Sequence, residues 1–96
     1  MSPDDIVSIL REYKKKNQGK YHIVNIGVFG SSARGPVDER SDVDIVVELE
    51  NPDMFHLIGI KQDLEEELNR PVDIVRYRKK MNAFLKDRIE REAVYA

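Results

Sequence analysis

Three segments of this chain have the composition of β-strands, and the unequal lengths of the links between them constrain the fold more than any other feature. Residues 21–29, 42–49 and 72–77 are rich in β-branched and aromatic side chains, which favour strands. A short glycine- and serine-containing link joins the first two, whereas residues 52–69, between the second and third, have helical periodicity. Parallel neighbours need a long crossover and antiparallel neighbours do not. We therefore predict a small mixed β-sheet, antiparallel between the first two strands and parallel between the second and third.

Segments with helical periodicity precede, separate and follow the predicted strands. The helix over residues 52–69 is expected to be capped by Asn51. In the last helix we expect Phe84 to face inward, and Arg88 and Glu92 to pair on the outward side at helical spacing. The fold class is therefore α/β (α+β), a small mixed sheet flanked by helices in the order α-β-(α)-β-α-β-α.

Composition excludes several classes of protein. The chain has no cysteine, which excludes disulfide frameworks, cysteine-based zinc sites and thiol nucleophiles. There is no apolar run long enough to span a membrane and no basic-then-apolar signal start, so we expect a cytoplasmic protein with no membrane partner. Sixteen basic and eighteen acidic residues leave a net charge of −2. This balance is not typical of nucleic-acid binders, and no direct nucleic-acid binding is expected.

The near-neutral total conceals an acidic centre. Residues 37–73 carry a net charge of −9, whereas residues 1–36 carry +3 and residues 74–96 carry +4. Carboxylates that cluster in a folded protein repel one another unless a cation relieves them. The acidic centre therefore directs attention to the aspartates of the second and third predicted strands.

Three aspartates are expected to meet at one edge of the predicted sheet. Asp42 and Asp44 lie two residues apart at the start of the second strand and share a face. Asp73 opens the third strand, which starts at the same edge if the two strands are parallel. Gly30 and Ser31 end the antiparallel first strand there too. Mg²⁺ takes hard oxygen ligands from carboxylates, phosphates and water, so this edge is a candidate magnesium site.

The turn after the first strand offers groups that bind phosphate. Gly30 and Ser31 supply backbone N–H groups and a hydroxyl at a helix start. Arg34 adds a forked cationic donor, although it has the alternative of pairing with the acidic segment. Together the groups predict a site for a metal-bound nucleoside triphosphate. One or two Mg²⁺ ions there would activate an acceptor oxygen and stabilise the leaving pyrophosphate.

The motifs in combination resemble those of the minimal nucleotidyltransferases of the DNA-polymerase-β-like superfamily. The family's Gly-Ser-X-X-Arg-Gly and Ser-Asp-X-Asp motifs correspond to residues 30–35 and 41–44, and its third carboxylate strand corresponds to residues 72–75. The resemblance implies one minimal nucleotidyltransferase domain over residues 1–96, with a polymerase-β-like palm core and AMP transfer from ATP. It implies Mg²⁺ and catalytic roles for Asp42, Asp44 and Asp73, and nucleotide contacts from Gly30, Ser31, Arg34 and Ser41.

The ending of the chain, residues 89–95, is similar to that of the small prokaryotic antitoxin members of this superfamily. In such members the partner is a HEPN-domain ribonuclease toxin encoded alongside, which the antitoxin neutralises by adenylylation, typically on a tyrosine. The resemblance therefore implies a toxin protein as acceptor and ATP as substrate. The basic strip at residues 76–80 and the terminal Val94 and Tyr95 are candidate docking elements, with a solvated loop and a frayed tail as the alternative.

Other functions remain open from the sequence. A phosphatase of the haloacid-dehalogenase type would need threonine where Val46 stands, and no Walker-type Gly-Lys-Ser/Thr follows the glycine turn. A non-catalytic antitoxin that occludes its partner is the main alternative, although occlusion does not require clustered aspartates. A nucleotidyltransferase for a small molecule is the third option, which the lack of an acceptor-binding domain disfavours.

Overall fold

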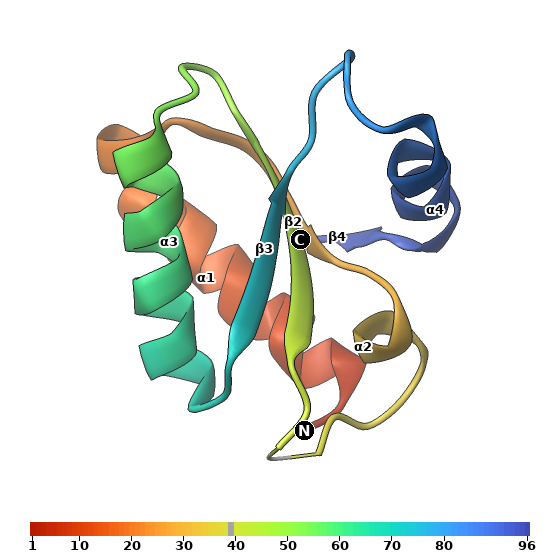
Figure 1. Cartoon of the computed structure of the whole chain (residues 1–96). Helices are drawn as coiled ribbons and strands as arrows, with labels where there is room; N and C mark the ends of the chain where they lie inside the picture. The colour runs from red at the N-terminus through yellow and green to blue at the C-terminus, as the bar shows by residue number, and fades with distance from the viewer. Residues whose placement is uncertain (39) are drawn as a thin grey trace.

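The computed structural model describes residues 1–38 and 40–96 of the chain. In that part, helices and strands follow one another as α1 (Pro3–Tyr21), β1 (Ile23–Val28), α2 (Ser31–Arg34), β2 (Val43–Leu49), α3 (Met54–Leu68), β3 (Val72–Arg76), α4 (Ala83–Glu92) and β4 (Val94–Tyr95) (Figure 1). The predicted order of elements is confirmed. The short strand β4 is an addition that the sequence analysis did not predict.

The strands form one mixed sheet in the order β3-β2-β1-β4. As predicted, β1 pairs with β2 in antiparallel orientation, and β2 pairs with β3 in parallel orientation. The reason is the length of each connection. The short segment with α2 joins the end of β1 to the adjacent start of β2, whereas α3 returns the chain along the length of the strands, so that β3 starts beside the start of β2. Strand β4 pairs antiparallel with the free side of β1.

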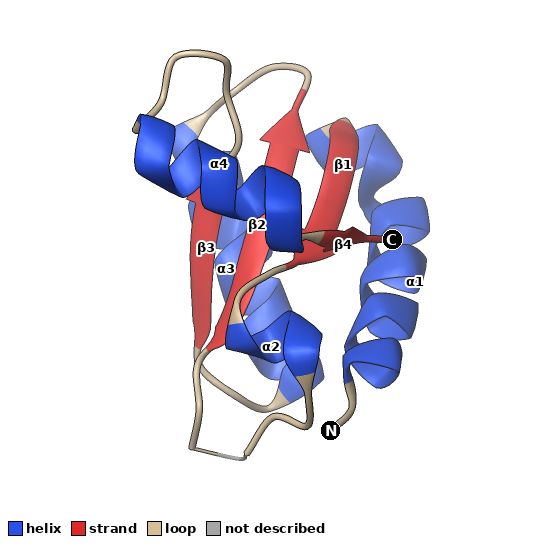
Figure 2. Cartoon of the chain, turned by 90° about the vertical axis from the view of Figure 1, so that its right-hand side faces the viewer, coloured by secondary structure: helices blue, strands red, loops and turns tan. Residues whose placement is uncertain are grey.

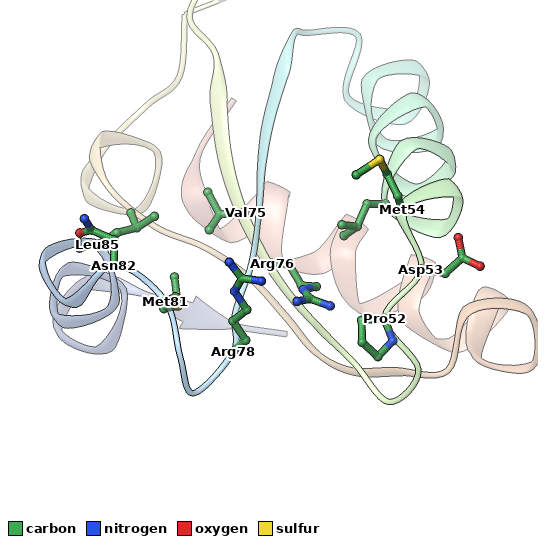
Figure 3. A pocket seen from close by; sticks show the side chains of 10 residues that line it. Pro52, Asp53, Met54, Val75, Arg76, Arg78, Met81, Asn82 and Leu85 are labelled. Atoms are coloured by element: carbon green, nitrogen blue, oxygen red, sulfur yellow. Dashed lines mark hydrogen bonds between the residues drawn. The ribbon is translucent and has the colours of Figure 1, made fainter.

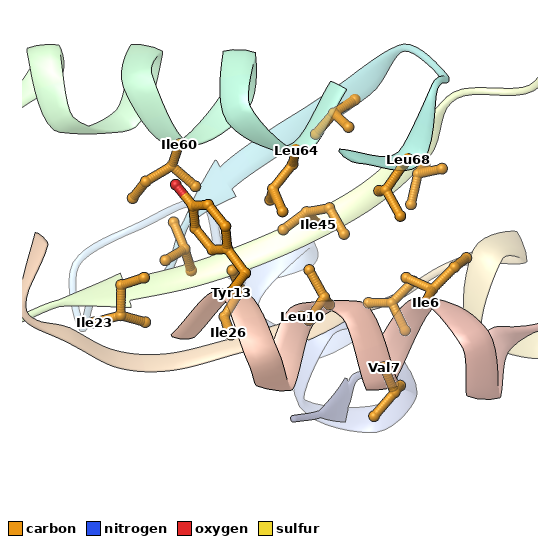
Figure 4. Close-up of a cluster of buried hydrophobic side chains, with 14 of the residues drawn as sticks. Ile6, Val7, Leu10, Tyr13, Ile23, Ile26, Ile45, Ile60, Leu64 and Leu68 are labelled. Carbon is orange, nitrogen blue, oxygen red and sulfur yellow. The ribbon is translucent and has the colours of Figure 1, made fainter. Parts of the chain in front are cut away.

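Helices cover the two faces of the sheet unequally. Helices α1 and α3 lie against one face, and α4 crosses part of the other face (Figure 2). Side chains of α1 and α3 meet over β2 in the main core (Figure 4), whose largest fully buried members include Ile6, Leu10, Ile26, Ile45, Ile60 and Leu64. A smaller cluster under α4 is built on Phe29, Val46 and Ile89. The starts of β2 and β3 therefore keep polar side chains on the α4 face.

Polar contacts define where the helices begin and how they pack. The carboxylate of Asp53 accepts a hydrogen bond from the N–H of Phe55 at 2.7 Å and caps α3, so the prediction of Asn51 as the cap was wrong. The hydroxyl of Tyr13 in α1 donates to Asp63 in α3 at 2.7 Å. Burial and the neighbouring carboxylate raise the pKa of Tyr13 above its ordinary value. The bond fastens α1 to α3 at the edge of the main core.

Two further features of the surface bear on function. Phe84 in the first turn of α4 is 88% exposed, so the prediction that it faces inward was wrong. Ile89 is the buried residue of this helix, and Leu85, next to Phe84, packs against the same cluster. Among residues 1–38 and 40–96, none of the helices combines the length and the apolar composition that crossing a lipid bilayer requires.

Gly27 is expected to be essential for seating β4. It lies opposite Tyr95, and a Cβ at Gly27 would stand 2.6 Å from the carbonyl oxygen of Val94 and 2.9 Å from the Tyr95 ring. We expect Gly27→Ala to displace β4 and to lower the free energy of unfolding by about 1–3 kcal/mol, as overpacking does. Amide hydrogen exchange should show faster exchange at Ala96, whose N–H donates to Ile26.

Gly19→Ala is the matched control for that substitution. Gly19 lies within helix α1, and nothing approaches within 4 Å of the position of its Cβ. Alanine is the better helix former, so this variant should gain about 0.5–1 kcal/mol. Equal effects of the two alanines on stability and on exchange at Ala96 would contradict the assigned role of Gly27.

Candidate active site

The candidate site lies at the end of the sheet where β2 and β3 begin (Figure 1). This end, which carries Asp42, Asp44 and Asp73, is called the aspartate edge. Asp44 and Asp73 are register partners in these parallel strands, so their side chains leave the same face on neighbouring strands. Asp42 precedes β2 by one residue and is exposed, as is Asp73, whereas Asp44 is half-buried. The structure therefore brings the three aspartates to one edge, as the connection lengths predicted.

Asp44 is the carboxylate most affected by this arrangement. Burial raises its pKa above the ordinary value, and the negative charges of Asp73 and Asp42 raise it further. The nearby Arg88 acts in the opposite direction without cancelling the rise. Negative charge at this edge is thus only partly neutralised by the chain itself, which favours a bound cation.

Gly30 allows the turn after β1 to lie against Asp44. Its φ of 65° falls in the region that glycine favours. A Cβ at this residue would stand 2.8 Å from Oδ2 of Asp44 and 2.8 Å from Nη2 of Arg88. The N–H of the preceding Phe29 donates to the carbonyl of Asp44 at 3.0 Å. Glycine is therefore required here both for the backbone conformation and for the space between two charged groups.

Ser32, a residue that the sequence analysis passed over, holds the aspartates in place. It is buried, and its hydroxyl accepts a hydrogen bond from the N–H of Asp44 at 3.2 Å and donates to the carbonyl of Asp42 at 3.4 Å. The neighbouring Ser31 is exposed. Of the two serines in the motif, one thus fixes α2 to the start of β2 and the other remains accessible to a ligand. The doubled serine was the only sequence signal for this division.

The two remaining predicted residues lie at the rim. Arg34 is exposed and pairs with Glu92, Nη1 to Oε1, at 3.3 Å, so its partner belongs to α4 and not to the acidic segment. Ser41 is exposed in the turn before β2, and its N–H donates to the carbonyl of Asp38 at 3.1 Å. Glu92 also pairs with Arg88. The predicted pair of Arg88 and Glu92 is therefore confirmed and Arg88 is exposed, although Glu92 is half-buried because the last turn of α4 lies beside the glycine turn.

The carboxylate oxygens of these aspartates suit a Mg²⁺ ion that also binds a phosphate ligand. Within residues 1–38 and 40–96, no three histidine, cysteine or acidic side chains are grouped so that they would hold a metal ion by themselves. Magnesium in proteins commonly takes one or two carboxylates and completes its shell with water and substrate phosphate. The aspartate edge, with unrelieved negative charge on Asp44 and an accessible glycine turn, fits that pattern.

A separate pocket of about 460 Å³ lies away from the aspartates, between the start of α3, the end of β3 and the start of α4 (Figure 3). Its lining includes the cationic Arg76 and Arg78 and the apolar Met54, Met81 and Leu85. Arg76 is the last residue of β3 and Asp73 the second, so this pocket lies at the opposite end of the strands from the aspartates. It has no carboxylate pair and is not the catalytic candidate.

Sequence comparison identifies relatives that match almost end to end. A family model described as a nucleotidyltransferase domain matches residues 7–96. The protein adenylyltransferase MntA of Thermococcus cleftensis is 37% identical over 93 residues, which cover 96% of this chain and 93% of that protein. A Methanocaldococcus jannaschii protein with the proposed assignment of protein adenylyltransferase is 37% identical over 92 residues, which cover 95% of this chain and 94% of the relative.

Solved structures share the fold. One, described as a proposed minimal nucleotidyltransferase, superposes with a TM-score of 0.77 and 30% identity, covering 98% of this chain and 95% of the other. A crystal structure of a toxin-antitoxin with AMP-PNP superposes with a TM-score of 0.74, covering 92% of this chain and 69% of the other. At 21% identity the second likeness shows the fold alone.

Asp44→Asn should stabilise the protein in the absence of nucleotide. Because the pKa of Asp44 is raised, the folded state loses stability as the pH rises from the ordinary carboxyl value of 3.8 through the raised one. The asparagine variant lacks that penalty, so we expect its thermal midpoint at neutral pH in chelator to be a few degrees higher. The gain should vanish below pH 3.8. A lower midpoint at neutral pH would contradict the inferred repulsion, and Asp87→Asn at an exposed pair should change little.

Ser32→Ala should destabilise the protein, whereas Ser31→Ala should change its stability little. The first leaves the N–H of Asp44 and the carbonyl of Asp42 without their partner, which should cost about 1–3 kcal/mol of unfolding free energy. The second removes an exposed hydroxyl and should stay within about 0.5 kcal/mol of wild type. Chemical denaturation of both variants measures the difference. Equal stabilities would show that Ser32 does not hold the aspartate edge.

Proposed function

This chain belongs to the nucleotidyltransferase domain family, and from that membership we propose that it is an antitoxin that transfers AMP from ATP to a toxin protein. The observation that carries the proposal is the in-register pair of Asp44 and Asp73 beside the glycine turn at Gly30. The near end-to-end similarity of this chain to protein adenylyltransferases supports a protein acceptor. We take residues 1–96 as one minimal nucleotidyltransferase domain.

In this proposal the carboxylates of Asp42, Asp44 and Asp73 hold one or two Mg²⁺ ions, consistent with the raised pKa of Asp44. When bound, the metal neutralises the charge that develops on the phosphate oxygens and favours ionisation of the acceptor hydroxyl. Gly30 and Ser31 supply the N–H groups and hydroxyl that orient the triphosphate.

The reaction exchanges one phosphorus–oxygen bond for another. The acceptor oxygen bonds to the α-phosphorus of ATP as the bond between that phosphorus and the β-phosphate bridging oxygen breaks. Pyrophosphate leaves, and the hydroxyl proton passes to a carboxylate at the edge or to water. In this proposal Ser41 and Arg34, both exposed at the rim, contact the triphosphate, and the guanidinium of Arg34 offsets the charge on the leaving pyrophosphate.

A HEPN-domain ribonuclease toxin, modified on a tyrosine hydroxyl, is the proposed acceptor. The pocket between α3 and α4 supports docking of a protein surface, because Phe55 and Phe84, the sequence neighbours of its lining residues Met54 and Leu85, are 82% and 88% exposed. Exposed aromatic side chains of this size are typical of interaction sites. Arg76 and Arg78 in the same pocket form no ion pair within the described residues, and they favour an acidic rim on the partner.

The test is transfer of AMP to the HEPN-domain protein encoded by the neighbouring reading frame. Wild type, ATP labelled in the α-phosphate and Mg²⁺ should label that protein, and mass spectrometry should find added AMP. The double variant Asp42→Asn, Asp44→Asn should remain folded and lose at least about a hundredfold in rate, as removal of charge-stabilising groups does. Chelation of the metal should abolish labelling.

The same experiment separates catalysis from occlusion. If wild type transfers no AMP and the double variant neutralises the toxin as well as wild type does, the chain acts by binding alone and the proposed enzyme activity is wrong. Lys15→Gln, at an exposed position of α1, a helix that contributes none of the proposed site residues, is the control variant and should label the toxin at the wild-type rate.

A further inference from the structure

We propose that Arg88 binds the triphosphate of ATP beside the Gly30 turn, with Glu92 as the residue that positions it. The inference rests on the proposed function and deepens it, because it adds the last turn of α4 to the nucleotide site. The family motifs in residues 30–35 and 41–44 do not contain either residue. The assignment comes from where α4 ends in the folded chain.

Arg88 is already in contact range of the phosphate-binding turn. Its Nη2 and Oδ2 of Asp44 both lie 2.8 Å from the point that a Cβ on Gly30 would occupy. A phosphate oxygen that accepts hydrogen bonds from the Gly30–Ser31 backbone is therefore within reach of the guanidinium. Arginine suits this role because its planar, permanently charged fork donates two parallel hydrogen bonds to phosphate oxygens.

Two neighbours orient the Arg88 side chain. Its Nε donates to Oε2 of Glu92 at 3.2 Å, and its guanidinium carbon lies 5.6 Å from the centre of the Phe29 ring. The first contact engages Nε of the guanidinium, and the second engages one of its flat faces. With Nε and one face engaged, the Nη groups are the donors left to point toward the turn.

Glu92 connects two arginines that reach the site from different elements. Its Oε1 pairs with Nη1 of Arg34 at 3.3 Å, while its Oε2 pairs with Arg88. The Glu92 side chain is only 20% exposed, whereas those of Arg34 and Arg88 are 68% and 45% exposed. The glutamate is therefore the fixed member, and it keeps two positive charges at the rim before the nucleotide arrives.

The end of α4 is anchored firmly enough to act as a wall of the site. Ile89 is fully buried against Phe29 and Val46, and β4 follows the helix directly and pairs with β1. The N–H of Ala96 donates to the carbonyl of Ile26 at 2.9 Å. These contacts fix the turn that carries Arg88 and Glu92 against β1, the strand that precedes the Gly30 turn.

Another ion pair on the same helix supplies a matched control. Arg91 and Asp87 have the same i,i+4 spacing as Arg88 and Glu92, and a 3.0 Å contact, yet their side chains are 69% and 65% exposed. An exposed pair of this kind contributes little beyond helix stability. If Arg88 were only such a pair, the glutamine variants of the two arginines would behave alike.

The test is the binding of ATP with Mg²⁺, measured by titration calorimetry on Arg88→Gln, Arg88→Lys and Arg91→Gln. We expect Arg88→Gln to weaken binding by roughly tenfold or more, the loss expected for a charge-assisted hydrogen bond. Arg88→Lys should recover part of the affinity, and Arg91→Gln should bind within about twofold of wild type. The unfolding midpoints of the two glutamine variants without ATP measure any loss of stability, which separates that loss from the loss of binding.

The positioning role of Glu92 is tested in the same assay. Glu92→Gln should weaken ATP binding, and the effect of Arg88→Gln should be smaller in that background, because the arginine is no longer oriented. Independent, additive effects would overturn the role of Glu92. In AMP transfer, Arg88→Gln should raise KM for ATP more than it lowers kcat.

The outcomes distinguish this inference from the proposed function. Equal ATP affinities of Arg88→Gln and Arg91→Gln, with wild type binding ATP, would overturn the role of Arg88 alone. A wild type that binds ATP but transfers no AMP would overturn the proposed function and leave the role of Arg88 to be decided by the affinities. A wild type that binds no ATP would overturn both.

Discussion

The parallel pairing of β2 with β3 is the constraint on which the rest of the structure depends. It places Asp44 opposite Asp73, in register and on one face. A shift of one residue would turn one of these side chains to the main core, because successive strand residues face opposite sides. The buried alternation of Val43, Ile45 and Val47 resists such a shift. The hydrophobic core on one face thus determines the geometry of the charged site on the other.

The arrangement of the site lowers the stability of the folded state. Burial and two nearby aspartates raise the pKa of Asp44, and Gly30 adopts a backbone conformation with positive φ. Ser32 offsets part of this cost through its hydrogen bonds to the backbone of Asp42 and Asp44. A divalent cation shared with the substrate phosphates would relieve the remaining negative charge, which is the behaviour expected of a site organised for binding and not for stability.

The C-terminal segment shows how a small chain can build an active-site rim. Strand β4 has only two residues, yet its pairing with β1 fixes the last turn of α4 beside the glycine turn. Gly27 permits this approach because any side chain there would meet Val94. The first turn of the same helix carries the exposed Phe84 at the other end of the sheet. One helix thereby contributes to both the proposed nucleotide site and the proposed docking surface.

The sequence by itself determined the three long strands, their directions and the aspartate edge, because hydrophobic periodicity and connection lengths are local properties. It also predicted, through their motif, that Gly30 and Ser31 bind phosphate. Only the tertiary structure decided that Ser32 faces inward, that Arg88 and Glu92 border the site, and that β4 exists. These features depend on contacts between segments far apart in the chain. The i,i+4 spacing of Arg88 and Glu92 is the same on either side of a helix, so only packing could tell which side faces the site.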